Sequence, residues 1–307
     1  MSHLNQIVQT SVSFALRHTP EMPGRGRIAR VVNKYFPLPA SRVARVRMRL
    51  GHKMLVDPRS ATEFAAYYTG DYDTAAIRSV MRLLNPDSIV LDVGANIGNH
   101  TVALAKIFKR VECVEPHPVL FRVLQANVLY NHLGHVRCHN IGLANENSSG
   151  TLTESPGNHA LNRVRERSQL SPETFGLTGE AFSNEYKIDL VSAAEFIGQF
   201  GEELNRAFIK IDVEGMEQEI ITAIEPLLLQ YKPLFGFEWF THSQPQLTRI
   251  VRSVPGYDVW VIRVHDSGRS YLWRAVKMFF RGRSYTLERF DPDHMDDVYP
   301  LALLVPK

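Results

Sequence analysis

The stretch Ile89-Val90-Leu91-Asp92-Val93-Gly94-Ala95-Asn96-Ile97-Gly98-Asn99-His100 decides the fold of this chain. It opens with a run of apolar, β-branched residues that is typical of a fully buried strand. The strand pattern breaks at Gly94, and a helix pattern begins at Ile97. In α/β sheets, a strand, a glycine turn and a helix form the cradle for a nucleotide-like ligand. We therefore predict a parallel α/β sheet with a ligand site at this turn.

The residues of the turn indicate the kind of ligand. The fingerprint is G-x-N-x-G behind an acidic residue, and it differs from the G-x-G-x-x-G of dinucleotide-binding enzymes. Glycine lacks a Cβ, so the backbone can approach a ligand closely. The carboxylate of Asp92 would repel a pyrophosphate and attract a cation. S-adenosylmethionine (SAM) fits, since it carries ammonium and sulfonium charges. The predicted cofactor-binding residues of the turn are Asp92, Gly94, Asn96, Gly98 and Asn99.

A second acidic residue, Glu115, ends the next predicted strand, 21 residues after Gly94. Right-handed crossovers place consecutive parallel strands side by side, with their carboxyl ends on one rim. A carboxylate at that position can accept hydrogen bonds from both hydroxyls of a ribose. The competing interpretation of Glu115 is a surface acid before a turn. We predict that Glu115 binds the ribose of the cofactor.

A second stretch carries charge inside an apolar strand. It runs Phe208-Ile209-Lys210-Ile211-Asp212-Val213-Glu214-Gly215-Met216-Glu217. A buried ammonium without a partner is expensive, so Lys210 must meet a carboxylate, and Asp212 or Asp92 is within reach in this topology. Asp212 and Glu214 follow the strand and should reach the same rim as Glu115. We predict Lys210 and Asp212 as catalytic residues and Glu214 as a substrate contact; a purely structural ion-pair network is the alternative.

A third stretch, Phe237-Glu238-Trp239-Phe240-Thr241-His242, ends another predicted strand. Glu238 should reach the same rim, and His242 follows in the next loop. Histidine is the commonest general base, because its pKa lies near neutrality. We predict Glu238 and His242 as catalytic residues. Together with Asp212 they also offer ligands for a divalent cation, but their spacing is not diagnostic of a metal site.

Composition limits the classes of protein that the chain can belong to. It has 307 residues, a formal net charge of +3 and a hydrophobic share of 44%. This charge is too small to indicate a nucleic-acid partner, and we expect none. Cys113 and Cys138 are interpreted as reduced thiols in neighbouring strands. No apolar run approaches the roughly 20 residues that span a bilayer, and no signal-peptide pattern is present. We expect a cytoplasmic location.

The first 57 residues form a basic extension. Between Arg17 and Lys53 there are ten Lys or Arg residues and one acid. The apolar residues near the N-terminus have the spacing of an amphipathic helix. Arg42, Arg45 and Arg49 would share one face if this part were helical. That face is interpreted either as a solvated arm or as a contact for an anionic partner, such as a lipid headgroup or a charged polymer.

Residues 58–307 are predicted to form one domain in which strands alternate with helices. Helices are expected over residues 60–85, and a hairpin over residues 142–154. The polar stretch 155–185 is interpreted as a lid or substrate loop. The strands of the sheet are expected at residues 89–93, 111–115, 136–140, 207–212 and 234–238, with short strands from 257 onward.

These motifs resemble the FkbM family of SAM-dependent methyltransferases. The resemblance rests on DVGANIG at 92–98, VEPHP at 114–118, the spacing of Leu124, Asn127 and Asn131, and KIDVEGME at 210–217. It covers about residues 60–307 and implies a class I methyltransferase fold with a seven-stranded, mostly parallel sheet and helices on both faces. It also implies methyl transfer to a hydroxyl of a sugar, polysaccharide, glycolipid or polyketide. Asn140 is then expected near the adenine. His117 stands where the family often has Asn.

A hydroxyl becomes a good nucleophile only when its proton is withdrawn, so a base is expected at the rim. His242 and Asp212 are the candidates. Two other functions stay open at this point. One is a nicotinamide-dependent oxidoreductase, which the missing third glycine disfavours. The other is a polyanion-binding module that uses the basic extension.

Overall fold

The computed structural model describes residues 3–19, 24–38, 43–154, 163–164, 184–239, 254–265, 284–290 and 299–307. The chain divides into two compact units. Unit 1 comprises Met1–Ala75 and Arg263–Thr286, and unit 2 comprises Ala76–Ile262 and Leu287–Lys307. Of the helices in the described ranges, none is both long enough and apolar enough to cross a bilayer.

The described part of unit 1 contains three helices and a two-stranded ribbon. In chain order these are α1 (His3–His18), α2 (Arg25–Tyr35), β1 (Ala44–Arg47), β2 (Lys53–Val56) and α3 (Ala61–Thr69). Leu16 of α1, Ala29 of α2 and Tyr68 of α3 are buried against one another. The predicted N-terminal helix is therefore confirmed. Its buried side is made by Gln9, Ser13 and Leu16.

The shared helical face predicted for Arg42, Arg45 and Arg49 is wrong. β1 is a strand, and it pairs antiparallel with β2, so that Arg45 lies opposite Leu55. Alternation along the strand buries Val46 and leaves Arg45 exposed. Arg49 donates from Nη2 to the carbonyl oxygen of Thr19 at 2.7 Å and from Nε to that of Thr69 at 3.2 Å. It therefore satisfies carbonyl groups at or just beyond the ends of α1 and α3. Arg42 lies outside the described residues.

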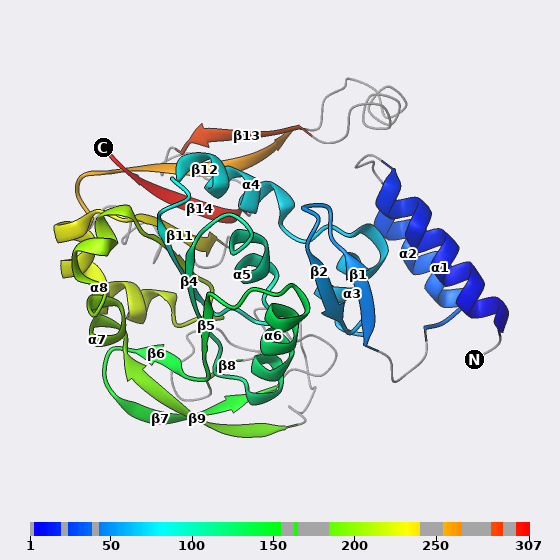
Figure 1. Ribbon diagram of the computed structural model, residues 1–307, viewed down its shortest axis with the longest axis horizontal. Coiled ribbons are helices and arrows are strands. Elements are labelled where there is room, and N and C mark those ends of the chain that lie inside the picture. The colour runs from blue at the N-terminus through cyan, green and yellow to red at the C-terminus, as the bar shows by residue number, and fades with distance from the viewer. Residues whose placement is uncertain are drawn as a thin grey trace. The chain divides into compact units, whose positions relative to one another are not determined.

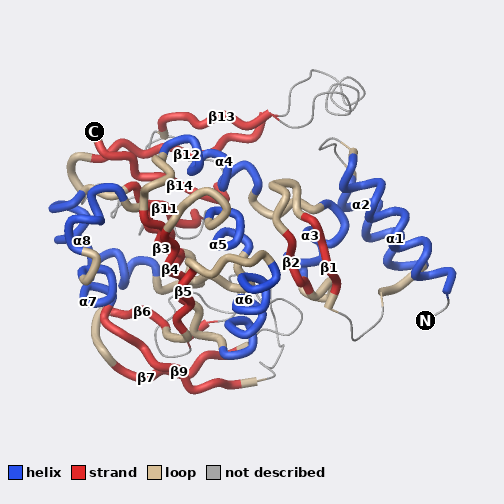
Figure 2. The backbone as a smooth tube through the Cα atoms, viewed as in Figure 1, coloured by secondary structure: helices blue, strands red, loops and turns tan. Residues whose placement is uncertain are grey.

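Unit 2 is organised around an eight-stranded sheet (Figures 1 and 2). The strand order is β13-β12-β14-β11-β10-β3-β4-β5. All pairings from β11 to β5 are parallel, whereas β14 is antiparallel to both of its neighbours. The sheet therefore has one strand more than the seven that were expected, and the additional strand is β13 at its edge. The bounds are β3 (Ile89–Val93), β4 (Arg110–Val114), β5 (Val136–His139), β10 (Phe208–Ile211), β11 (Leu234–Trp239), β12 (Tyr257–His265), β13 (Ser284–Arg289) and β14 (Tyr299–Pro306).

Helices cover both faces of this sheet, as predicted. Leu91, Ile209 and Phe235 on one face join a single core with Ile220 and Ile224 of α8. Figure 1 shows α7 and α8 on that side and α5 and α6 on the other. The helices of this region are α4 (Thr74–Leu83), α5 (Asn99–Leu104), α6 (Pro118–Tyr130), α7 (Ala193–Gly198), the 3-10 helix η3 (Gly201–Arg206) and α8 (Glu217–Tyr231).

The prediction of a hairpin at residues 142–154 is wrong, because these residues belong to a second, four-stranded sheet. Its order is β6 (Gly142–Ala144), β9 (Glu185–Ser192), β7 (Ser148–Thr153) and β8 (Arg163–Val164). β9 lies between β6 and β7, parallel to the first and antiparallel to the second. The side chain of Asn147 explains this arrangement in part, because its oxygen accepts a hydrogen bond from the amide of Ser192 at 2.7 Å. Most of the predicted lid at 155–185 lies outside the described residues.

The two cysteines meet the prediction made for them. Cys113 of β4 and Cys138 of β5 are register partners in neighbouring parallel strands. Both are free thiols, and Cys113 is buried.

Candidate functional site

The site lies at the carboxyl ends of three neighbouring parallel strands. The register aligns Val93 of β3 with Val114 of β4 and with the last residue of β10. The residues that follow, Gly94, Glu115 and Asp212, therefore leave the sheet at one rim. Backbone hydrogen bonds hold them there: the amide of Gly94 donates to the Val114 oxygen at 2.9 Å, and that of Asp212 to the Val93 oxygen at 3.0 Å. The structure thus brings together three segments that were predicted to share an edge.

The two glycines of the first turn are required by contacts within the protein. Gly94 has φ +79°, and a Cβ on it would lie 1.7 Å from the carbonyl oxygen of Asp212. Gly98 has φ +92°, and its Cβ would lie 2.6 Å from Cδ1 of Leu124 in α6. From the sequence, both glycines are expected to allow the close approach of a ligand. In the structure they allow the turn to pack against the loop after β10 and against α6.

Asn96 shapes the turn between the two glycines. Its φ is +52°, a left-handed conformation that asparagine tolerates better than most residues. Its amide donates to Oε2 of Glu115 at 2.7 Å, and its side-chain oxygen accepts from the amide of Ile97 at 2.7 Å. Asn99 is buried in the first turn of α5. The turn is therefore fixed by its own side chains and by Glu115.

Glu115 is a buried carboxyl group at the rim, directly after β4. Its two oxygens accept one backbone amide each, from Asn96 at 2.7 Å and from His117 at 2.9 Å. Burial raises the pKa of Glu115 to about 7, and the two amide hydrogen bonds limit the rise. Each oxygen keeps a lone pair after these bonds, so the ionised group can accept two more donors.

Lys210 connects the first turn with the loop after β10. Its side chain is 4% exposed, and Nζ lies 3.3 Å from Oδ1 of Asp92 and 3.1 Å from Oδ2 of Asp212. The prediction that Lys210 meets one of these carboxylates is confirmed for both. Oδ2 of Asp92 accepts a hydrogen bond from Thr101 at 2.6 Å. A line of polar groups therefore runs from the buried Asp92 to Asp212, whose side chain is 30% exposed at the rim.

The loop after β10 concentrates further carboxyl groups. Glu217 accepts the amides of Val213 at 3.0 Å and Gly215 at 2.9 Å, which closes the loop on the first turn of α8. Burial raises the pKa of Glu217. Burial, and then the charge of Asp212, also raises the pKa of Glu214 well above its usual value. The carboxylates of Asp92 and Asp212 both lie beside the Lys210 ammonium, so the balance of these three charges is negative and favours a positively charged ligand.

The chain matches the family model described as "Methyltransferase FkbM domain" over residues 92–285. The match covers more than half of the chain and begins at Asp92. The chain belongs to the FkbM methyltransferase family.

Three known proteins are similar to this chain. Methyltransferase 1 of Beauveria bassiana (strain ARSEF 2860) is 27% identical over 150 residues, which are 45% of this chain and 59% of that protein. Methyltransferase FkbM from Methylobacillus flagellatus KT is 15% identical, with a TM-score of 0.43 over 98% of this chain and 59% of that one. TYW2 of M. jannaschii, solved with AdoMet, is 11% identical, with a TM-score of 0.37 over 88% of this chain and 90% of that one. The chain thus spans 59% of the length of each of the first two relatives.

The remaining predicted residues of the FkbM domain are less completely described. β10 pairs in parallel with β11, and Ile211 lies opposite Phe237, so Glu238 follows beside Asp212. The side chain of Glu238 and the whole of His242 lie outside the described residues. Within the described ranges, no three His, Cys, Asp or Glu side chains are grouped so that they could hold a metal ion. A catalytic role for Glu238 and His242 stays a prediction.

Two side chains support the site in ways that the sequence argument missed. His117 caps α6, since its Nδ1 accepts the amides of Val119 at 3.2 Å and Leu120 at 3.4 Å. The proline directly after it, at the first helical position, was the available signal. Asn127 donates to the carbonyl oxygen of Ile97 at 2.8 Å and so ties α6 to the glycine turn. A buried polar residue among the apolar positions of α6 was the signal there.

Asn140, predicted near the adenine, holds the turn after β4. Its side-chain amide donates to the carbonyl oxygens of Glu115 at 2.8 Å and Pro116 at 3.1 Å. It is exposed at the end of β5. The structure therefore gives Asn140 a definite role in positioning Glu115, and its contact with a ligand stays a prediction.

Gly94→Ala is expected to lower the free energy of unfolding by about 3 kcal/mol, because the new methyl group meets the Asp212 carbonyl at a strained φ. Urea unfolding followed by circular dichroism measures the change. Gly134→Ala is the matched control, since Gly134 has no positive φ and no atom within 4 Å of an added Cβ. Equal stability of the two variants would contradict the packing assigned to the turn.

Proposed function

We propose that this chain is a SAM-dependent O-methyltransferase whose acceptor is a hydroxyl of a sugar, glycolipid, polysaccharide or polyketide-type molecule. The observation that carries the proposal is the meeting of three segments at one rim: the turn after β3, Glu115 after β4, and the acidic loop after β10. Membership of the FkbM family supports the methyl-transfer part of this proposal. The hydroxyl acceptor is what the resemblance to the FkbM family implies, and Asp212, partly exposed at the rim, is the candidate base for it.

The described residues fit SAM in two respects. Glu115 is a buried carboxyl group with lone pairs left for a ribose diol. Asp92 and Asp212 place two carboxylates beside the ammonium of Lys210, which suits a ligand with ammonium and sulfonium charges. The predicted SAM contacts in the turn remain Asp92, Gly94, Asn96, Gly98 and Asn99, with Asn140 near the adenine.

Bound SAM would supply a methyl group attached to a positively charged sulfur. When the methyl group is transferred, the rest of the molecule leaves as a neutral thioether. The protein then has to orient the acceptor oxygen and remove its proton. Asp212 is partly exposed at the rim, and Lys210 beside it stabilises its ionised form. We infer that Asp212 or His242 takes the proton, that Glu238 and Glu214 line the acceptor side, and that Lys210 positions Asp212. No divalent cation enters this proposal.

Titration by calorimetry with SAM and, separately, with NAD tests the cofactor. Binding of SAM but not NAD supports the proposal. Binding of NAD but not SAM would contradict it and favour a nicotinamide-dependent oxidoreductase. The acceptor is tested by a SAM-consumption screen over sugars, glycolipids and polyketide alcohols, with mass spectrometry of the product. Transfer only to nitrogen or carbon would contradict the O-directed assignment.

Glu115→Gln is expected to weaken SAM binding by about tenfold or more, because an amide cannot accept both ribose hydroxyls as a carboxylate does. Calorimetry at neutral pH measures the Kd. Glu112→Gln is the control, since Glu112 is a buried carboxyl within β4, the strand before Glu115, and accepts a hydrogen bond from His139 at 2.9 Å. An unchanged Kd for SAM in the Glu115→Gln variant would show that Glu115 does not bind the cofactor.

The affinity for SAM is expected to rise about tenfold between pH 6 and pH 8. The pKa of Glu115 is raised to about 7, so the carboxyl is mostly protonated at the lower pH and mostly ionised at the higher one. Only the ionised form accepts from both hydroxyls. In the Glu115→Gln variant, the Kd for SAM should not show this change with pH. A flat profile in the parent protein would show that Glu115 does not take part.

Asp212→Asn and His242→Ala are each expected to lower kcat about 100-fold or more if the residue is the base, while the Kd for SAM changes little. Single-turnover assays with the acceptor found in the screen measure the effect. His135→Ala serves as a control, because His135 lies away from the rim and contacts the carbonyl oxygen of Ala105. Normal turnover in both variants would mean that another group takes the proton.

A further inference from the structure

The exposed apolar side chains of the chain are concentrated at its N-terminal end. Among the described residues, twelve large hydrophobic side chains are exposed, and seven of these precede residue 44. Single exposed apolar residues are ordinary on soluble proteins, but a concentration of them marks an interaction surface. The seven are Leu4, Ile7 and Phe14 of α1, Ile28, Val31 and Tyr35 of α2, and Val43.

On α2 these side chains form a stripe with helical spacing. Ile28, Val31 and Tyr35 follow one another at intervals of three and four residues, and they are 42%, 51% and 68% exposed. The buried side of the same helix is formed by Arg25 and Ala29. The stripe therefore belongs to a face of α2 that the core of unit 1 does not use.

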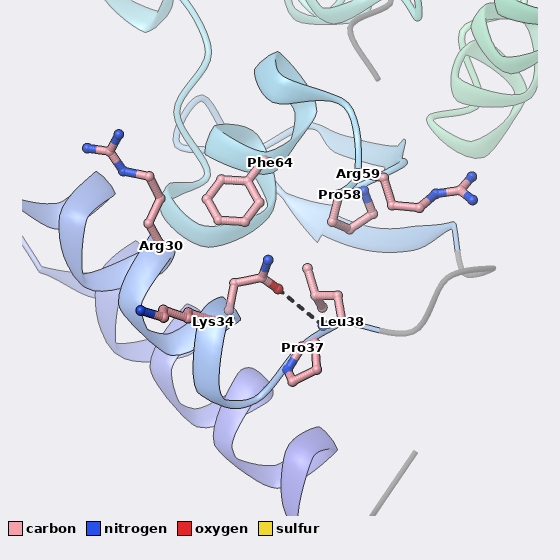
Figure 3. Close-up of a pocket in the computed structure, with 8 residues that line it drawn as sticks. Arg30, Lys34, Pro37, Leu38, Pro58, Arg59 and Phe64 are labelled. Atoms are coloured by element: carbon pink, nitrogen blue, oxygen red, sulfur yellow. Dashed lines mark hydrogen bonds between the residues drawn. The ribbon is translucent and has the colours of Figure 1, made fainter. Parts of the chain in front are cut away.

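A pocket of about 710 Å³ lies within unit 1, and α2 contributes Arg30 and Lys34 to its lining. Its middle is apolar, with Phe64, Leu38 and Pro58 side by side (Figure 3). Arg30 and Lys34 of α2 lie on one side of these residues, and Arg59 lies on the other (Figure 3). The pocket is completed by Asn33 and Pro37, and the Asn33 oxygen accepts a hydrogen bond from the amide of Leu38 at 3.1 Å.

Two of the three cations are available to a ligand. Nε of Arg59 donates to Oδ1 of Asp57 at 2.7 Å, so its charge is balanced. For Arg30 and Lys34, the described part of the chain provides no ion pair; Arg30 donates to the Gly26 carbonyl oxygen at 3.3 Å, and Lys34 lies over the Tyr35 ring. Residues 1–75 hold eleven Lys or Arg and five Asp or Glu, whereas acids are in excess in the rest of the chain.

We propose that unit 1 docks on the surface of an anionic lipid bilayer. The cations of the pocket, Arg30 and Lys34, contact headgroup phosphates, and the stripe Ile28, Val31 and Tyr35 enters the interfacial region. An exposed apolar face flanked by cations on an amphipathic helix is the arrangement that interfacial helices use. A nucleic acid in water would match the cations but would leave the aliphatic side chains Ile28 and Val31 without a partner.

Co-sedimentation of the full chain with vesicles tests this proposal. Vesicles of phosphatidylcholine with 30% phosphatidylglycerol should bind the protein at least tenfold better than vesicles of phosphatidylcholine alone, and added salt should weaken the binding. The double variant Arg30→Gln with Lys34→Gln is expected to bind the anionic vesicles roughly 30-fold more weakly. The double variant Val31→Ser with Tyr35→Ser is expected to lose about tenfold or more.

The chain offers matched controls for both changes. Arg78 and Arg82 are also exposed and one turn apart, on α4, so Arg78→Gln with Arg82→Gln removes the same charge elsewhere. Leu129 of α6 is 74% exposed, and Leu129→Ser removes an apolar side chain outside unit 1. Both controls should bind vesicles as the parent chain does. Binding that is absent, equal on the two kinds of vesicle, or lost equally in the controls would overturn the proposal.

The other occupants of this face give distinct results. If sedimentation equilibrium finds a dimer that Val31→Ser with Tyr35→Ser dissociates, and vesicles are not bound, the face joins two copies of the chain and the proposal is wrong. If the protein binds single-stranded RNA through Arg30 and Lys34 and ignores the vesicles, the proposal is wrong as well. SAM binding is measured separately, so failure of the docking proposal leaves the proposed activity untouched.

Discussion

The buried ammonium of Lys210 is the interaction on which the rim depends. Its position between Asp92 and Asp212 is enforced, because removing one partner from a buried ion pair destabilises a protein by roughly 3–5 kcal/mol. Asp92 belongs to the strand before the glycine turn, and Asp212 to the loop after the neighbouring strand. The ion pair therefore fixes the two segments to each other and places a partly exposed carboxylate at the rim.

The backbone around this ion pair has almost no freedom. The turn after β3 has a glycine where the Asp212 carbonyl allows no Cβ, and it donates the amide of Asn96 to Glu115. The loop after β10 closes on itself through Glu217, which accepts two of its amides. A rigid rim of this kind can hold a cofactor and an acceptor at a fixed distance, which is most of what methyl transfer asks of a protein.

The sequence predicted the parallel sheet and the converging residues because buried strands and glycine turns leave strong local patterns. Lys210 was informative for the same reason, since an ammonium inside an apolar strand demands a partner. Long-range pairing left weaker signals. The strand β9, which separates β6 from β7, is more than thirty residues from either in the chain, so residues 142–154 resembled a local hairpin. Arg45 and Arg49 have helical spacing, but strand pairing with β2 decides the conformation of Arg45, and Arg49 lies in the turn between the two strands.

The central claim is that the glycine turn, Glu115 and the acidic loop form one SAM site. A crystal structure of the chain with S-adenosylhomocysteine tests it most directly. We predict both ribose hydroxyls within hydrogen-bonding distance of the Glu115 carboxylate, the homocysteine part beside the turn from Gly94 to Gly98, and Asp212 facing the open side of the sulfur. A ligand bound away from this rim, or a ribose that does not contact Glu115, would contradict the claim.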